Sequence, residues 1–332
     1  MVPLLARTIF LALLGAALLS PASTLAQAVG STDPLTISVS PQYPVPYGQV
    51  VLSPISNALD LSTVTFVVVA GGKEVYRGNA KPVAITLGGA GILTSVRATI
   101  SSAQGSYSQS LSIRPQDVAL VVEPIASAPV LYPGKPLTPL EGTARVVAVA
   151  NLRTSGGAQI APNTLSYSWT VDGAQVGSAS GIGKNSISVE SPLQYRAGDV
   201  SVVVASPDGA LVGGAATSLK AQDPVVRVYE NNPLLGIRFD HALSGSYTLT
   251  GTEISLYGAA YSFPTRAGAP TLQWFVGGAS QQSGPAITLR PTGQGVGSAN
   301  ISLTAAAGQY VRAATGLSLS FTIRESTNFL GL

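Results

Sequence analysis

The sequence predicts an all-β protein that contains three β-sandwiches in tandem, and three observations support this prediction. Beyond residue 30, apolar residues alternate with polar ones or form short β-branched runs, such as the one at 200–204. Turn-forming Ser, Gly, Pro, Asn and Asp interrupt these runs about every 8 to 12 residues, a spacing typical of sandwiches and barrels. The third observation is a set of landmarks that recurs three times along the chain.

The composition limits the chemistry that this chain can support. Of its 332 residues, 45% are hydrophobic, so there is enough apolar material for packed cores. The chain has no Cys and only one His, which excludes disulfides, thiolate chemistry and a two-histidine metal site within one chain. Its net charge of +3 arises from few charged residues. With so few basic residues there is little electrostatic attraction to nucleic acid, so we expect no nucleic-acid partner. The lack of suitable side chains likewise leads us to expect no metal and no cofactor.

Residues 1–28 have the pattern of a secretory signal peptide. Arg7 precedes an apolar run from Ile9 to Leu19, and Ala-Gln-Ala at 26–28 supplies the small residues of a cleavage site. The alternative is an uncleaved membrane anchor, but the run is shorter than the roughly 20 residues that cross a bilayer. We expect export to the extracellular space, cell surface or periplasm, with no transmembrane segment in the mature chain.

Each copy of the repeat has four landmarks in the same order. An Asp precedes a β-branched strand near residues 33, 117 and 223; an aromatic residue lies within a later strand; a turn dipeptide follows it; and a second glycine turn comes later. The turn dipeptides supply the positive φ values of two-residue hairpins. The aromatic residues are Phe66, Trp169 and Trp274, the dipeptides are Gly71-Gly72, Asp172-Gly173 and Gly277-Gly278, and the later glycines are Gly105, Gly209 and Gly308.

Copies of about 100 residues have the size of an immunoglobulin-like sandwich. In that fold a Trp on a central strand fills the space between the sheets, so we expect Phe66, Trp169 and Trp274 to form structural cores. The predicted fold is therefore three tandem immunoglobulin-like β-sandwiches after a signal peptide. The expected limits are 1–28 for the signal peptide, 29–115, 116–222 and 223–325 for the repeats, and 326–332 for an apolar tail.

The central strand of the second copy resembles a known module. Tyr-Ser-Trp-Thr-Val-Asp-Gly at 167–173 is similar to the Y-x-W-x-F-G-D-G motif of bacterial PKD modules, shortened by one residue and with Val for Phe. The third copy keeps only Trp-Phe-Val-Gly-Gly at 274–278, and the first keeps only its aromatic residue and glycine pair. The whole layout also resembles uncharacterised exported proteins of uncultivated ultrasmall bacteria, a resemblance that implies no particular function.

The motifs that could indicate catalysis are incomplete. His241 follows Asp240, but no G-x-S-x-G motif accompanies them, and neighbouring residues on a strand point to opposite faces. Residues 181–186 resemble a phosphate-binding loop, yet Ser178 replaces its first glycine and Asn185 its Ser/Thr. We therefore expect no enzymatic activity.

Carboxylates at the repeat junctions offer a weak calcium site. Asp117 has Glu123 nearby in sequence, and Asp223 has Glu230. Two acids per junction fall short of the six to eight oxygen ligands that calcium prefers, so we expect no metal there.

Apolar residues outside the strand pattern are the candidate partner contacts. Between the first two strands, the second and third copies are longer than the first, and the chain also ends in an apolar tail. These extensions either pack against the neighbouring repeat or bind a partner. The candidate residues are Leu131, Tyr132, Leu234, Leu235, Ile237, Phe239, Phe329 and Leu330.

The function that fits these observations best is that of an exported, non-enzymatic envelope or cell-surface protein, acting as an adhesive, spacer or scaffold. Its partner would be a protein or glycan at the cell envelope. One alternative is a glycan- or cell-wall-binding module, for which the candidate residues are Tyr43, Tyr107, Tyr195, Tyr257, Tyr261 and Tyr310. Another is an accessory subunit of a pilus or secretion assembly that uses its tail or a sheet edge for strand addition.

Overall fold

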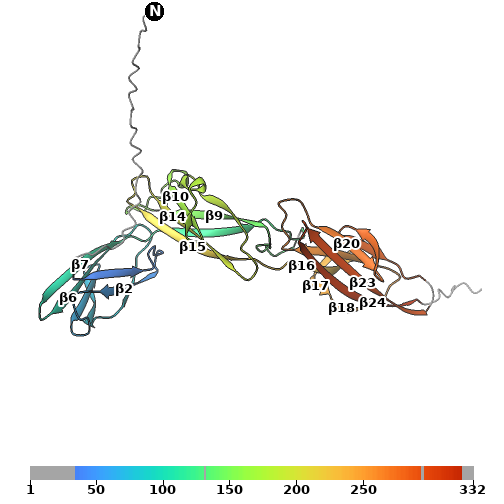
Figure 1. Ribbon diagram of the computed structural model, residues 1–332, viewed down its shortest axis with the longest axis horizontal. Coiled ribbons are helices and arrows are strands. Elements are labelled where there is room, and N and C mark those ends of the chain that lie inside the picture. The colour runs from blue at the N-terminus through green and yellow to red at the C-terminus, as the bar shows by residue number, and fades with distance from the viewer. Residues whose placement is uncertain (1–33, 131, 293–294, 324–332) are drawn as a thin grey trace, which may run out of the picture.

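Three two-sheet β-sandwiches follow one another in chain order (Figure 1). The computed structural model describes residues 34–130, 132–292 and 295–323. The described part consists of strands, turns and two single-turn 3₁₀ helices, η1 (Pro162–Thr164) and η2 (Gly177–Ala179), which confirms the predicted all-β class. None of its helices has the length and apolar character needed to cross a membrane.

Repeat 1 packs a three-stranded sheet, in the order β1-β2-β5, on a four-stranded sheet in the order β4-β3-β6-β7. Strand β4 pairs with β3, so it extends the sheet that holds the last two strands and not the sheet of β5, unlike the fourth strand of constant-type immunoglobulin domains. The strands are β1 (Thr36–Ser40), β2 (Gln49–Ile55), β3 (Thr65–Ala70), β4 (Lys73–Asn79), β5 (Val83–Thr86), β6 (Thr94–Ser102) and β7 (Gly105–Ile113).

Repeat 2 has the same plan, with sheets β13-β9-β8 and β11-β10-β14-β15, and β12 also pairs with β10. The segment between β8 and β9 has no strand, as the long loop predicted there implies. The strands are β8 (Asp117–Pro124), β9 (Thr143–Asn151), β10 (Ser166–Val171), β11 (Ala174–Gln175), β12 (Gly181–Ile182), β13 (Ser186–Glu190), β14 (Ala197–Ala205) and β15 (Val212–Lys220).

Repeat 3 adds two strands to this plan, with sheets β17-β16-β19-β22 and β18-β24-β23-β20-β21. Its strands are β16 (Val225–Asn232), β17 (Gly236–Leu243), β18 (Gly245–Leu249), β19 (Ile254–Tyr261), β20 (Thr271–Val276), β21 (Ala279–Ser283), β22 (Ala286–Leu289), β23 (Gly295–Ala307) and β24 (Val311–Ile323).

The prediction of a long loop after the first strand of repeat 3 is wrong. The chain instead turns back as β17 beside β16, then crosses to the other sheet as β18, which pairs in parallel with β24. The physical reason is visible in the sequence, because Ile237 and Phe239 alternate with the polar residues Arg238 and Asp240, and Leu243 lies on the same face of the strand.

The three landmark aromatics lie between the sheets. Phe66, Trp169 and Trp274 are each 0% exposed. The two indole N–H groups donate to backbone oxygens at the same place in each fold, Trp169 to Lys184 at 2.9 Å and Trp274 to Gly284 at 3.0 Å. Both indole rings are therefore buried with their N–H groups hydrogen-bonded.

Candidate contact surfaces

The long segment of repeat 2, residues 125–142, packs against repeat 3, and we call it the junction segment. Ser127 N–H donates to the carbonyl of Phe263 at 2.8 Å, and the carbonyl of Ser127 accepts the N–H of Ser262 at 3.0 Å. The Ser127 hydroxyl accepts the N–H of Phe263 at 3.1 Å. The backbone of repeat 2 thus adds a short antiparallel pairing to the segment that follows β19.

Two of the candidate contact residues meet in an aromatic cluster at this junction. The Tyr132 ring lies 5.0 Å from Tyr261 and 6.1 Å from Phe239, and Phe239 lies 5.1 Å from Tyr229 and 6.1 Å from Tyr257, all with edge-to-face geometry. The phenols of Tyr229 and Tyr261 share a hydrogen bond of 2.9 Å. Burial, aided by this bond, raises the pKa of the Tyr261 phenol far above its usual value. Tyr132 and Phe239 are therefore occupied by contacts within the chain.

A second pair of candidates is exposed at the tip of the β16–β17 hairpin. Leu234 and Leu235 are 93% and 70% exposed. The side-chain carbonyl of Asn232 accepts the backbone N–H groups of both leucines, at 3.0 and 3.1 Å. Gly236 supplies the φ of 75° that closes the turn. The turn is thus preformed and presents two leucines to solvent.

Of the four remaining candidate contact residues, one lies in the part of the chain that the structure describes. Ile237 is half-buried on β17, opposite Asn231. Leu131, Phe329 and Leu330 lie outside the described residues, as does the leader at 1–28.

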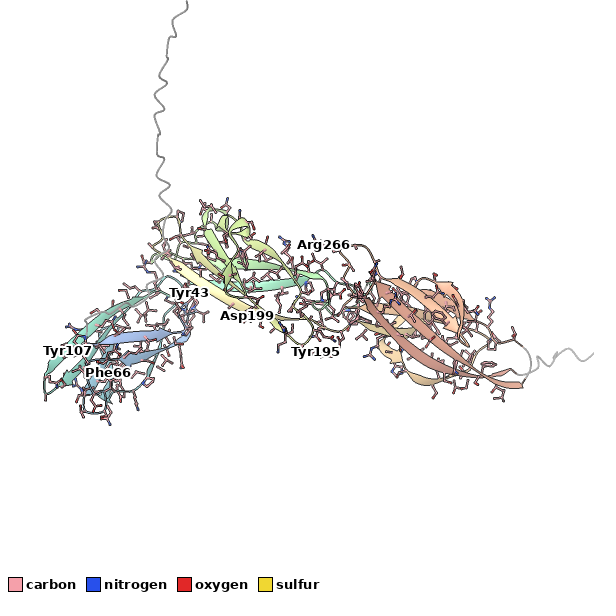
Figure 2. The ribbon with its side chains drawn as sticks, viewed as in Figure 1. Tyr43, Phe66, Tyr107, Tyr195, Asp199 and Arg266 are labelled. Atoms are coloured by element: carbon pink, nitrogen blue, oxygen red, sulfur yellow. The ribbon has the colours of Figure 1, made fainter. Side chains whose placement is uncertain are left out.

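The six candidate tyrosines do not form one row. Tyr107 packs on the core of repeat 1, Tyr257 and Tyr261 belong to the junction cluster, and Figure 2 shows Tyr43 and Tyr195 at different ends of repeat 2. Tyr195 is 92% exposed and Tyr310, on the β23–β24 turn, is 78% exposed.

Sequence reasoning missed one exposed aromatic residue. Tyr47 of repeat 1 is largely exposed and has a positive φ of 59°. The Pro-Tyr-Gly sequence at 46–48 is a turn signal that could have identified it.

A hollow of about 650 Å³ opens at the edge of repeat 2, next to the loop that carries Tyr195. Its walls are apolar, including Ile187 and Leu219, and Asp172, Glu190 and Arg196 supply polar groups. Its size is in the range of small-ligand sites, which are about 300–1,000 Å³.

The residues of the incomplete catalytic motifs form turns and ion pairs or are exposed. Arg238 pairs with Asp240 at 3.0 Å and its hydrogen bonds lower the pKa of that carboxyl, while His241 is exposed on β17. Gly183 forms a turn with φ of 70°, and strand β13 follows where a phosphate loop would have a helix.

The junction carboxylates have protein partners of their own. Glu123 pairs with Arg145 at 3.3 Å, and Asp223 accepts a hydrogen bond from Gln194 at 2.8 Å. Within the part of the chain that the structure describes, no group of three or more His, Cys, Asp or Glu could hold a metal ion.

No protein-family model matches the chain, and no curated protein sequence matches it. Among solved structures, it is similar to the central fibronectin-III array of RIM-binding protein, at 10% identity and a TM-score of 0.31 over 89% of this chain and 99% of that one. It is also similar to immunoglobulin domains 1–5 of Sidekick-1, at 14% identity and a TM-score of 0.30 over 89% of this chain.

This chain spans only 61% of the Sidekick-1 structure. The three N-terminal domains of the highly immunogenic outer capsid protein of bacteriophage RB49 align at 13% identity and a TM-score of 0.24, over 87% of this chain and 99% of that one. The strand order of the repeats, two packed sheets with the central aromatic residue between them, is that of an immunoglobulin-like sandwich.

Proposed function

We propose that the chain is an exported, non-enzymatic protein of the cell envelope that acts as a spacer or scaffold and carries an adhesive contact. The observation that supports this most is the junction between repeats 2 and 3, where backbone pairing and aromatic packing join one sandwich to the next. A chain of sandwiches joined in this way suits a protein that holds a contact at a distance. The signal-peptide pattern of residues 1–28 supports export.

The expected domain limits and the PKD-type character of repeat 2 are part of this proposal. The limits after residues 115 and 222 fall between β7 and β8 and between β15 and β16. The motif at 167–173 supports the PKD-type character.

The proposed adhesive contact is the leucine tip, Leu234 and Leu235. Its preformed turn means that little conformational entropy is lost on binding, and both side chains are available. Its partner would be an apolar surface on an envelope protein, with Phe329 and Leu330 of the tail as a second proposed contact.

Association with the envelope of the source cell tests this proposal. We expect Leu234→Ser/Leu235→Ser to reduce association at least tenfold without changing the melting temperature. Val296→Ser is the matched control, because Val296 is an exposed apolar residue elsewhere in repeat 3. Full association by the double variant and by a chain ending at Ser326 would show that the contacts lie elsewhere. Hydrolysis of a glycan or peptide by the purified chain would overturn the non-enzymatic assignment.

A second candidate function is glycan binding at the hollow of repeat 2. Tyr195 is exposed beside this hollow, whose Asp172, Glu190 and Arg196 could bond to sugar hydroxyls. We expect Tyr195→Ala to abolish retention on envelope polysaccharide in affinity electrophoresis, whereas Tyr310→Ala leaves it intact. Equal migration of both variants and the wild type with and without polysaccharide would exclude this function.

A further inference from the structure

We infer that the junction segment, residues 125–142, joins repeats 2 and 3 into one cooperative folding unit, whereas repeat 1 unfolds on its own. This inference goes beyond the proposed function and does not depend on it. It concerns how the molecule transmits destabilisation from one sandwich to the next.

The first argument is that one residue belongs to both repeats. The Phe263 side chain is fully buried in the core of repeat 3, while both its backbone N–H and its carbonyl bond to Ser127 of repeat 2. Ser262, next to it, is also buried and bonds to the same serine. On separation of the two repeats, water would have to replace these hydrogen bonds, each of which contributes net stability to the joined state. The core of repeat 3 and the segment of repeat 2 are therefore stable together.

The second argument is the aromatic cluster. Tyr132 is its one member from repeat 2, and it contacts Tyr261 on β19 and Phe239 on β17. Aromatic pairs of this geometry contribute stability beyond the area that they bury. If repeat 3 unfolded alone, Tyr132 would lose all of these partners.

The third argument is that the connection between the repeats is itself bound to the junction segment. The N–H of Gln222 donates to the carbonyl of Thr138 at 2.8 Å, and Gln222 forms a parallel bridge with Pro139. Thr138 is buried. The connecting peptide is therefore held in place and does not act as a flexible linker.

The connecting peptide of the first junction is also bound: the N–H of Gly91 donates to the carbonyl of Pro115 at 2.9 Å, and the buried side chain of Gln116 bonds to the backbone of Arg153 at 2.7 and 3.1 Å. The junction between repeats 1 and 2 lacks the direct backbone pairing and the aromatic cluster of the second junction. It holds Tyr43 against Gly214, and Gly91 against the backbone of Arg153 and Thr154. Among the described residues, no hydrogen bond or ion pair joins 34–113 to 117–220. We therefore expect little coupling across it.

Native-state hydrogen exchange of the whole chain, read by mass spectrometry, tests the inference because it reports the opening of each repeat separately. Leu303→Ala removes a fully buried side chain from the core of repeat 3. We expect exchange at β9 and β14 of repeat 2 to accelerate by the same factor as exchange in repeat 3, at least tenfold, with repeat 1 unchanged. Unchanged exchange in repeat 2 would overturn the inference.

Two further variants keep the test decisive. Leu52→Ala, in the core of repeat 1, should accelerate exchange in repeat 1 alone, and acceleration of all three repeats would contradict the inference. Ile301→Val is a milder change in the core of repeat 3, to be used if Leu303→Ala does not fold.

The role of the junction segment is tested by adding Ser127→Pro/Tyr132→Ala to Leu303→Ala. We expect repeat 2 to regain slow exchange while repeat 3 remains fast. Tyr195→Ala is the matched control, since Tyr195 is an exposed tyrosine near the same end of repeat 2, and it should leave the coupling intact. Persistent coupling in this triple variant would show that the junction segment is not its cause.

Discussion

The two junctions of this protein use the same loop of the preceding repeat in different ways. In repeat 1, the segment after the first strand is short and places Tyr43 on the bare backbone of Gly214. In repeat 2, the corresponding segment is longer, and it supplies Ser127 for backbone pairing and Tyr132 for the aromatic cluster. Figure 1 shows a bend at the first junction, while repeats 2 and 3 follow one another more directly. We infer from this comparison that the loop after the first strand, and not the sandwich, determines how strongly neighbouring repeats are joined.

Gly214 shows how the two repeats pack at the first junction. A Cβ at this position would lie 2.6 Å from the Tyr43 ring, so Tyr43 rests where no side chain exists. This contact depends on shape alone, whereas at the second junction Ser127 adds hydrogen bonds that join residues of the two repeats directly. Directional bonds fix the relative orientation of two domains more narrowly than a single ring contact.

The largest expected effect comes from Trp169→Ala. Loss of a fully buried Trp costs about 3–5 kcal/mol of unfolding free energy. Because repeats 2 and 3 are joined, we expect calorimetry to show both melting earlier in one transition, with repeat 1 unchanged. A melt in which only repeat 2 shifts would show that repeats 2 and 3 unfold independently.

Tyr132→Ala should have an intermediate effect. It removes two aromatic contacts, each worth about 0.5–1.5 kcal/mol beyond buried area. We expect urea unfolding to separate into distinct transitions for repeats 2 and 3, followed through Trp169 and Trp274. Tyr43→Ala should leave those transitions in place, and equal effects of the two substitutions would remove the distinction.

A pH titration tests how much the buried phenol of Tyr261 contributes to the second junction. Burial and the bond from Tyr229 raise the pKa of Tyr261 in the folded chain, so the protonated phenol stabilises the junction. In the unfolded chain the phenol ionises near its ordinary value of about 10, so this contribution is complete below pH 10 and is lost as the pH rises above it. We expect the alkaline loss of stability to be shallower in Tyr261→Phe. Identical slopes in the variant and the wild type would contradict this assignment.

The smallest effect is expected from Arg266→Ala. Arg266 (Figure 2) pairs with Glu190 across the second junction at 3.3 Å, and both side chains are exposed. Such pairs contribute about 0–1 kcal/mol. We expect urea midpoints within error of the wild type, and a large shift would move the origin of the coupling from the junction segment to this ion pair.

The repeat landmarks predicted the sandwiches because turns and core aromatics are local signals. Asp172 and Gly173 have φ values of 49° and 80°, as the two-residue turn requires. The sequence analysis did not predict strand β17, because the third copy is longer than the first between its first two strands and this extra length was interpreted as a loop. The contacts of Tyr132 with Tyr261 and Phe239 could not be predicted, since they join positions far apart in sequence whose pairing depends on the tertiary fold.

The most direct test of the difference between the junctions is a pair of spin-label distance distributions. The chain has no Cys, so Ser110→Cys/Ser218→Cys spans the first junction and Ser218→Cys/Gln281→Cys spans the second without background labelling. We expect a narrow distribution across the second junction and a broader one across the first, and Ser127→Pro/Tyr132→Ala should broaden the second to match. Equally narrow distributions in the wild type, or a broader one across the second junction, would contradict the account.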